Sequence, residues 1–114
     1  MPMIRVTTNV EIEQARETLL SDLSKLIAEG IGKPERYVMA LVQTDSMLMS
    51  GQAGPSAFAE IRSIGGLGGD VRGKMTAALC SLLGERLAIP AERVYVNFVD
   101  VPAGDWGWNG QTFG

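Results

Sequence analysis

The 114-residue sequence contains no histidine and a single cysteine. Without histidine, imidazole catalysis and His-ligated metal sites are excluded. Cys80 alone cannot form an internal disulfide or a C-x-x-C redox or zinc pair. In an apolar helical stretch, such a thiol is most often a small buried hydrophobe. We therefore expect neither a metal site nor a cofactor.

An excess of positive charge and long apolar runs are also missing. Ten Lys and Arg residues against 13 Asp and Glu residues give a net charge of −3, and the basic residues are scattered, which argues against binding to nucleic acid. The longest strongly apolar run, Tyr37–Val42, is too short to cross a bilayer. The first residues turn acidic before the apolar part of a secretory signal could form. We expect a cytoplasmic protein that binds no membrane.

The first half of the chain predicts a strand, a helix and a second strand. Residues 3–7 have the pattern of a short strand, and Asn9 is a candidate N-cap for the helix that follows. That helix should end at Gly30 and Gly32. Its apolar stripe consists of Ile12, Ala15, Leu19, Leu23, Leu26 and Ile27. The nearly continuous apolar run at residues 37–43 is typical of a strand covered on both faces.

The second half predicts the same order again after a loop at residues 44–55. A strand is expected at residues 56–64, and Asp70 is a candidate N-cap for the second helix. The apolar stripe of that helix consists of Val71, Met75, Ala78, Leu79, Leu82, Leu83 and Leu87. Pro90 ends the helix, and residues 93–101 predict the last strand. Turn residues dominate the tail that follows.

The two halves resemble each other, which points to an α+β fold built from two βαβ pseudo-repeats. The segment "GKPERYVMALVQ" after the first helix matches "IPAERVYVNFVD" after the second. Two such units within one domain, residues 1–114, predict a four-stranded mixed sheet with two helices on one face. The other face would carry apolar side chains that nothing in this chain covers. Such a surface normally means oligomerisation.

A glycine-rich stretch invites comparison with nucleotide-binding loops but does not fit them. "GGDVRGKM" contains G-x-x-x-x-G-K, yet Met75 stands where a Mg²⁺-binding Ser or Thr belongs. Asp70 would repel phosphate, and Val71 replaces the third glycine of the dinucleotide pattern. We interpret the stretch as a tight turn into a helix.

Other polar and aromatic residues each allow two interpretations. Tyr95 and Asn97 share one face of the last strand. They are either an edge pair bonded to backbone or water, or the wall of a pocket. Lys33 either compensates the dipole of the helix before it or binds a ligand. The aromatic residues of the tail are core, pocket wall or interface anchor: Trp106, Trp108 and Phe113. Pro2 begins a strand although it cannot donate to the ladder.

Several short motifs occur together, in order, along nearly the whole chain. They are "MP" at the start, "TNV" at 8–10, "GKP" at 32–34, "SIGGLGG" at 63–69, "LCSLLGERL" at 79–87, "ERVYVN" at 92–97 and "GWNGQTF" at 107–113. The chain resembles the macrophage migration inhibitory factor family of the tautomerase superfamily. The resemblance implies a homotrimer in which three sheets wrap into a central barrel and the active sites lie between subunits.

The resemblance also implies a function, cofactor-independent keto–enol tautomerisation of arylpyruvates such as phenylpyruvate and p-hydroxyphenylpyruvate. Pro2, freed by removal of Met1, would be the general base and acid. Lys33 would bind the substrate carboxylate, and the backbone N–H of Ile64 would face the substrate. Tyr95 and Asn97 would reach in from the neighbouring subunit. The residues that match the pocket lining are Met3, Tyr37, Trp106, Trp108 and Phe113.

The chemistry is reasonable for these residue types. An α-amino group has a pKa of about 8, and burial and the charge of Lys33 would both lower it. The neutral amine would then be available as a base near neutral pH, and its protonated form as an acid for the return step.

The sequence also departs from the family pattern. Where several animal members carry C-x-x-C, this chain has Ser56–Ala59, "SAFA", so the oxidoreductase function is not expected. Trp106 replaces a smaller aliphatic residue and would narrow the pocket mouth, which predicts low efficiency. The alternative is a signalling or binding protein that retains a vestigial pocket. By family analogy, such a protein would leave the cell without a signal peptide.

Overall fold

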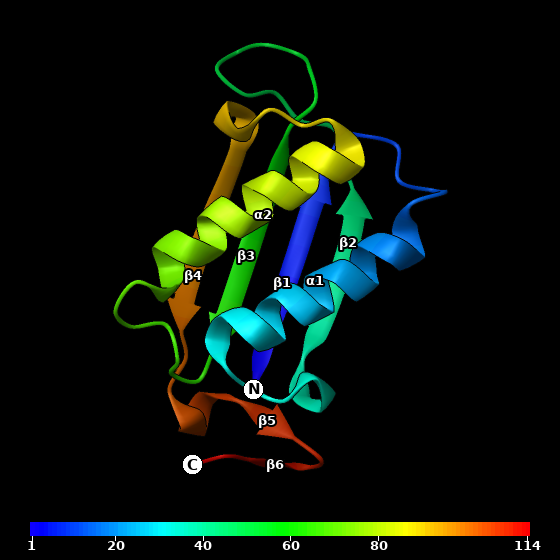
Figure 1. The fold of residues 1–114 in the computed structure, drawn as a ribbon. Helices are drawn as coiled ribbons and strands as arrows, with labels where there is room; N and C mark the ends of the chain where they lie inside the picture. The colour runs from blue at the N-terminus through cyan, green and yellow to red at the C-terminus, as the bar shows by residue number, and fades with distance from the viewer.

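The computed structural model describes residues 1–114 as a sheet with two helices packed on one side (Figure 1). The main elements are β1 (Pro2–Thr8), α1 (Arg16–Ile31), β2 (Met39–Thr44), β3 (Ala57–Ser63), α2 (Val71–Leu87) and β4 (Val94–Asp100). A small hairpin, β5 (Gly107–Trp108) and β6 (Gln111–Thr112), lies in the tail, and short 3-10 turns occupy η1 (Glu35–Tyr37), η2 (Ala91–Arg93) and η3 (Ala103–Asp105).

The large sheet has the strand order β2-β1-β3-β4. Each βαβ unit gives a parallel pair, β1 with β2 and β3 with β4, and the two units meet through the antiparallel pair β1–β3. The predicted α+β architecture of two βαβ repeats in a mixed sheet is therefore confirmed. The two central strands are the first of each unit, which relates the halves by a pseudo-twofold axis.

The helices cover the face of the sheet where alternate residues are fully buried. From β1 these include Ile4 and Val6, and from β3 Ala59 and Ile61. Helix α1 contributes Leu19, Leu23 and Ile27, and α2 contributes Met75, Leu79, Leu83 and Leu87. The spacing of four residues keeps each set on one side of its helix. The predicted apolar stripes are confirmed in part, because Ile12 and Ala15 precede α1 and Ala78 is exposed on α2. Neither helix is long and apolar enough to cross a membrane.

The opposite, open face is less apolar than the sequence predicted. Its exposed or half-buried apolar side chains include Met39 and Tyr95, which are 61% and 66% exposed. Arg5 on β1, however, pairs with Glu60 on β3 in the middle of this face, and Arg62 lies 3.9 Å from the same carboxylate. The expectation of an apolar face was wrong in part, because strand pairing places opposite charges side by side where they satisfy one another.

The two N-cap predictions also need correction. Asn9 does not cap α1, which begins seven residues later, at Arg16. Its side chain instead accepts a hydrogen bond from the backbone N–H of Ser56 at 2.9 Å and donates one to the carbonyl of Gly54 at 2.8 Å. Asp70 does occupy the N-cap position of α2, but its side chain makes no capping hydrogen bond and pairs with Lys74 at 2.9 Å.

The second strand was predicted to be covered on both faces, but β2 is an edge strand. It begins at Met39, and residues 35–37 form the turn η1 instead of extending the strand. None of its residues is fully buried. An apolar run of this length does not distinguish a central strand from an edge strand, which explains the error.

The turn after β3 brings the first helix and the start of β1 together. Ser63 donates its hydroxyl to the carbonyl of Gly65 at 2.7 Å, and Gly65 and Gly66 have left-handed φ values of 69° and 78°. A Cβ at Gly66 would lie 2.6 Å from Cγ2 of Ile31 and 3.6 Å from Cε of Lys33. A Cβ at Gly65 would meet nothing within 4 Å. Gly66 therefore allows close packing as well as the unusual backbone.

We predict that Gly66→Ala destabilises the protein more than Gly65→Ala. Both changes place a Cβ in the left-handed region, which costs roughly 1–2 kcal/mol. Only Gly66→Ala adds a clash with Ile31, which should raise the loss of free energy of unfolding by roughly another 1–3 kcal/mol. Urea denaturation at one fixed protein concentration measures the difference. Equal losses for the two variants would contradict the close packing described above.

Candidate active site

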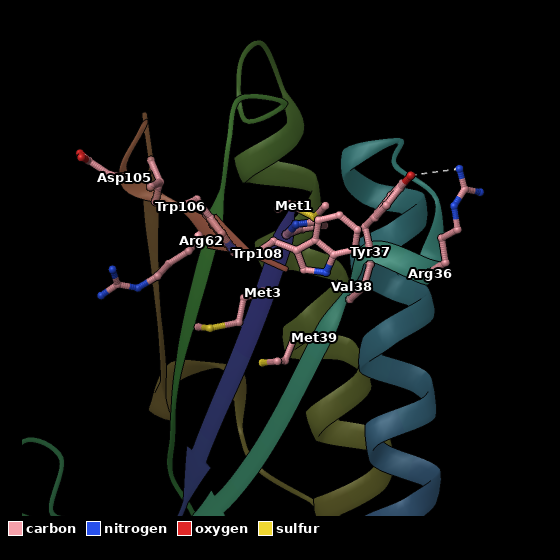
Figure 2. A pocket seen from close by; sticks show the side chains of 13 residues that line it. Met1, Met3, Arg36, Tyr37, Val38, Met39, Arg62, Asp105, Trp106 and Trp108 are labelled. Carbon is pink, nitrogen blue, oxygen red and sulfur yellow. Dashed lines mark hydrogen bonds between the residues drawn. The ribbon is translucent and has the colours of Figure 1, made fainter. Parts of the chain in front are cut away.

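A cavity of about 840 Å³ opens at the end of the sheet where β1 begins (Figure 2). Its walls come from the start of β1, from η1 and β2, from the end of β3 and from the segment that includes β5. Eight of the 13 lining residues are apolar. The lining consists of Met1, Pro2, Met3, Arg36, Tyr37, Val38, Met39, Arg62, Val101, Asp105, Trp106, Gly107 and Trp108. This volume lies in the range of small-molecule sites.

Pro2 and Met1 both line this cavity. Pro2 is buried and lies opposite Ser63 as the first residue of β1, a strand position that proline tolerates. Met1 precedes it here, so the Pro2 nitrogen belongs to a peptide bond and the free amine is that of Met1. Met1 shares the cavity with Tyr37 and Trp108 (Figure 2).

Lys33 is held beside this amine by the end of α1. Gly32 closes the helix with a left-handed φ of 77°, and Lys33 Nζ then donates a hydrogen bond of 2.6 Å to the backbone carbonyl of Ile64. Burial lowers the pKa of the Met1 amine, and the charge of Lys33 and a hydrogen bond with its side chain lower that pKa further. Each of these effects disfavours the charged form of the amine.

Aromatic side chains form two sides of the cavity. Tyr37 comes from η1, and Trp106 and Trp108 come from the tail beyond β4. The ring of Phe113 stacks on Trp108, with centroids 6.1 Å apart and planes 9° apart. Phe113 does not line the cavity itself but supports a residue that does. Trp106 lies in the wall, and the cavity remains open with this bulky side chain present.

Tyr95 and Asn97 do not meet Pro2 within one chain. Pro2 pairs with Ser63, and Ser63 pairs with Asp100, which places Pro2 level with the end of β4. Asn97 and Tyr95 lie three and five residues earlier on β4, about 10 and 17 Å along the strand at 3.3 Å per residue. They are also two strands away from β1. A single chain therefore presents Tyr95 and Asn97 on its open face, far from its own cavity.

Of the other predicted site residues, the structure brings Met3, Tyr37, Trp106 and Trp108 into the cavity lining with Pro2. Lys33 and Ile64 are joined by their hydrogen bond but are not among the lining residues, and Lys33 lies beside the amine.

Sequence reasoning missed several lining residues: Met1, Arg36, Val38, Met39, Arg62, Val101, Asp105 and Gly107. Arg36, Val38 and Met39 lie within two residues of Tyr37 in the chain, so the prediction that Tyr37 lines the pocket could have been extended to them. Arg62 reaches the cavity because it pairs with Met3 across β1 and β3. No local pattern in the sequence gives that register.

Comparisons with known proteins agree with this fold. The family model "Macrophage migration inhibitory factor (MIF)" matches residues 1–114. The chain is 41% identical over 114 residues to the macrophage migration inhibitory factor of Xenopus tropicalis and 40% identical to that of Meriones unguiculatus, with 99% of each chain covered.

Solved structures agree as well. The macrophage migration inhibitory factor homologue from Prochlorococcus marinus is 41% identical, with a TM-score of 0.94 over 98% of this chain and 99% of that one. The macrophage migration inhibitory factor-like protein from Entamoeba histolytica is 29% identical, with a TM-score of 0.93 over 98% of each chain. This chain belongs to the macrophage migration inhibitory factor family and has the fold of the tautomerase superfamily.

Proposed function

We propose that this protein is a keto–enol tautomerase that acts on arylpyruvates, with the amine of Pro2 as general base and acid once Met1 is removed. One observation carries the proposal. An amine at the start of β1 lies in a mainly apolar cavity beside Lys33, and its pKa is lowered by burial and by that lysine. Pro2 is one residue further into the strand and is buried, so the same two effects would act on its amine.

The proposed reaction moves one proton between carbon and oxygen. In the enolising direction, the neutral Pro2 amine removes a proton from C3 of the arylpyruvate, and the C2 carbonyl oxygen gains a proton from water to become the enol hydroxyl. In the return direction, the protonated amine gives the proton back to C3 while the hydroxyl loses its proton. Lys33 binds the carboxylate, and the aryl ring lies among Tyr37, Trp106 and Trp108, where apolar surface favours it.

We further propose that the site is completed between subunits of a homotrimer. Tyr95 and Asn97 lie far from the cavity of their own chain and are exposed on the open face. A neighbouring copy that packs on this face would bring them to a cavity where they orient the enolic oxygen or the aryl end. Burial of the exposed Met39 and Tyr95 would contribute to association.

The first test compares the protein with and without Met1. Protein that retains Met1, from cells deficient in methionine aminopeptidase, should ketonise phenylpyruvate enol about 10²–10⁴-fold more slowly than processed protein, because its Pro2 nitrogen is an amide. N-terminal mass identifies each sample. In processed protein, Pro2→Ala should also lose most activity. Equal turnover with and without Met1 would refute the proposed base, and no turnover in processed protein would favour a binding role.

The pH dependence provides a second test. Removal of the charge in Lys33→Gln should raise the pKa of the catalytic amine, because the lysine lowers the pKa of the amine beside it. The neutral base is then lost at a higher pH, so the acidic limb of the kcat/KM profile should move upward. KM for the carboxylate substrate should rise as well. The control is Lys25→Gln on the exposed side of α1. An acidic limb that stays in place would contradict the role of Lys33.

Mixed oligomers test whether neighbouring chains share a site. Asn97→Ala and Pro2→Ala should each be poorly active alone. In an equimolar random mixture, about a quarter of sites would combine an intact Pro2 with an intact Asn97 from the next chain. Refolding the two variants together should therefore restore about that fraction of activity. Sedimentation analysis should give a trimer mass, and no restoration would show that each site belongs to one chain.

A further inference from the structure

The charged residues around the cavity are unequally neutralised. Asp105 lines the cavity, but in Figure 2 its carboxylate points away from the other labelled side chains. Arg62 lies 3.9 Å from Glu60, which it shares with Arg5. Arg36 has no carboxylate within 4.0 Å, although the chain has a net charge of −3. The cavity thus carries a cation at its rim that no carboxylate of this chain neutralises.

The guanidinium of Arg36 is positioned by its neighbour in the chain. It lies over the ring of Tyr37, 4.6 Å from the centroid, and Nη2 donates a hydrogen bond of 3.3 Å to the Tyr37 hydroxyl. Figure 2 shows this hydroxyl at the outer end of the ring, next to Arg36. Only one of five guanidinium N–H groups is used in this way, so a planar fork remains free for a carboxylate.

We propose that Arg36 binds a second anionic group of the substrate, at the end of the aryl ring opposite the pyruvate carboxylate. The inference rests on the proposed function. With the first carboxylate at Lys33 near the amine and the ring along Tyr37, the far end of the ring emerges beside the Tyr37 hydroxyl and Arg36. The preferred substrates are then dianionic arylpyruvates that carry a carboxylate at the para position.

Selectivity for substrates with the second carboxylate should be lost when the guanidinium of Arg36 is removed. Wild-type protein should have a kcat/KM roughly threefold to tenfold higher for 4-carboxyphenylpyruvate than for phenylpyruvate, the range expected of an accessible charge-assisted contact. Arg36→Gln should reduce this ratio to about one and leave phenylpyruvate much less affected. Arg36→Lys, which keeps the charge without the fork, should give an intermediate ratio. Arg72→Gln, a change of the same charge on the exposed side of α2, should leave the ratio unchanged.

Binding of unreactive analogues separates this inference from the proposed chemistry. Calorimetric titration with 4-carboxycinnamate and cinnamate reads the second subsite even if the protein turns over no arylpyruvate. The wild type should bind 4-carboxycinnamate roughly threefold to tenfold more tightly, and Arg36→Gln should abolish the difference. Equal affinity of the wild type for both analogues would overturn the inference. So would an equal loss for both analogues in Arg36→Gln, because Arg36 would then act only through Tyr37.

Discussion

The pairing of β1 between β2 and β3 determines where the start of the chain lies. Backbone hydrogen bonds on both sides fix this strand, and Pro2 is held opposite Ser63 at its first position. Proline has no N–H to contribute to the ladder, so its nitrogen can face the cavity without the loss of a sheet hydrogen bond. The same pairing delivers Met3 and Arg62 to the cavity as neighbours. The proposed Pro2 base, placed in this way, would need no flexible side chain to position it.

The positive charge at the site comes from local structure and is opposite in sign to the net charge of the chain. Helix α1 ends at the left-handed Gly32, and the next residue, Lys33, is tied to the carbonyl of Ile64. The glycine turn after β3 permits this approach, since a side chain at Gly66 would collide with Ile31. Two turns from different halves of the chain therefore hold one cation beside the amine. The overall charge of −3 gave no indication of this environment.

Periodicity and the internal repeat were sufficient to predict the sheet and helices, because apolar spacing follows directly from which faces are buried. They were insufficient wherever strand register decides the outcome. The Arg5–Glu60 pair on the open face and the entry of Arg62 into the cavity both arise from the antiparallel β1–β3 contact. Asn9 was misassigned because its side chain serves a distant loop residue, Ser56, rather than the helix next to it. Strand alternation placed Tyr95 and Asn97 on one face and allowed a pocket wall, but only the family resemblance suggested that they reach a neighbouring subunit.

The position of Tyr95 and Asn97 also bears on how the cavity functions. Within one chain the cavity is an open trough, walled by Tyr37 and by Trp108, which is itself 57% exposed. Trp106 contributes to the wall without closing it, so the bulk of this residue is compatible with an aryl group. Under the proposed assembly, a neighbouring chain would exclude water from the amine and complete the polar contacts. A single chain would then have a base with a lowered pKa but incomplete means of orienting the substrate, which would make association part of the proposed mechanism.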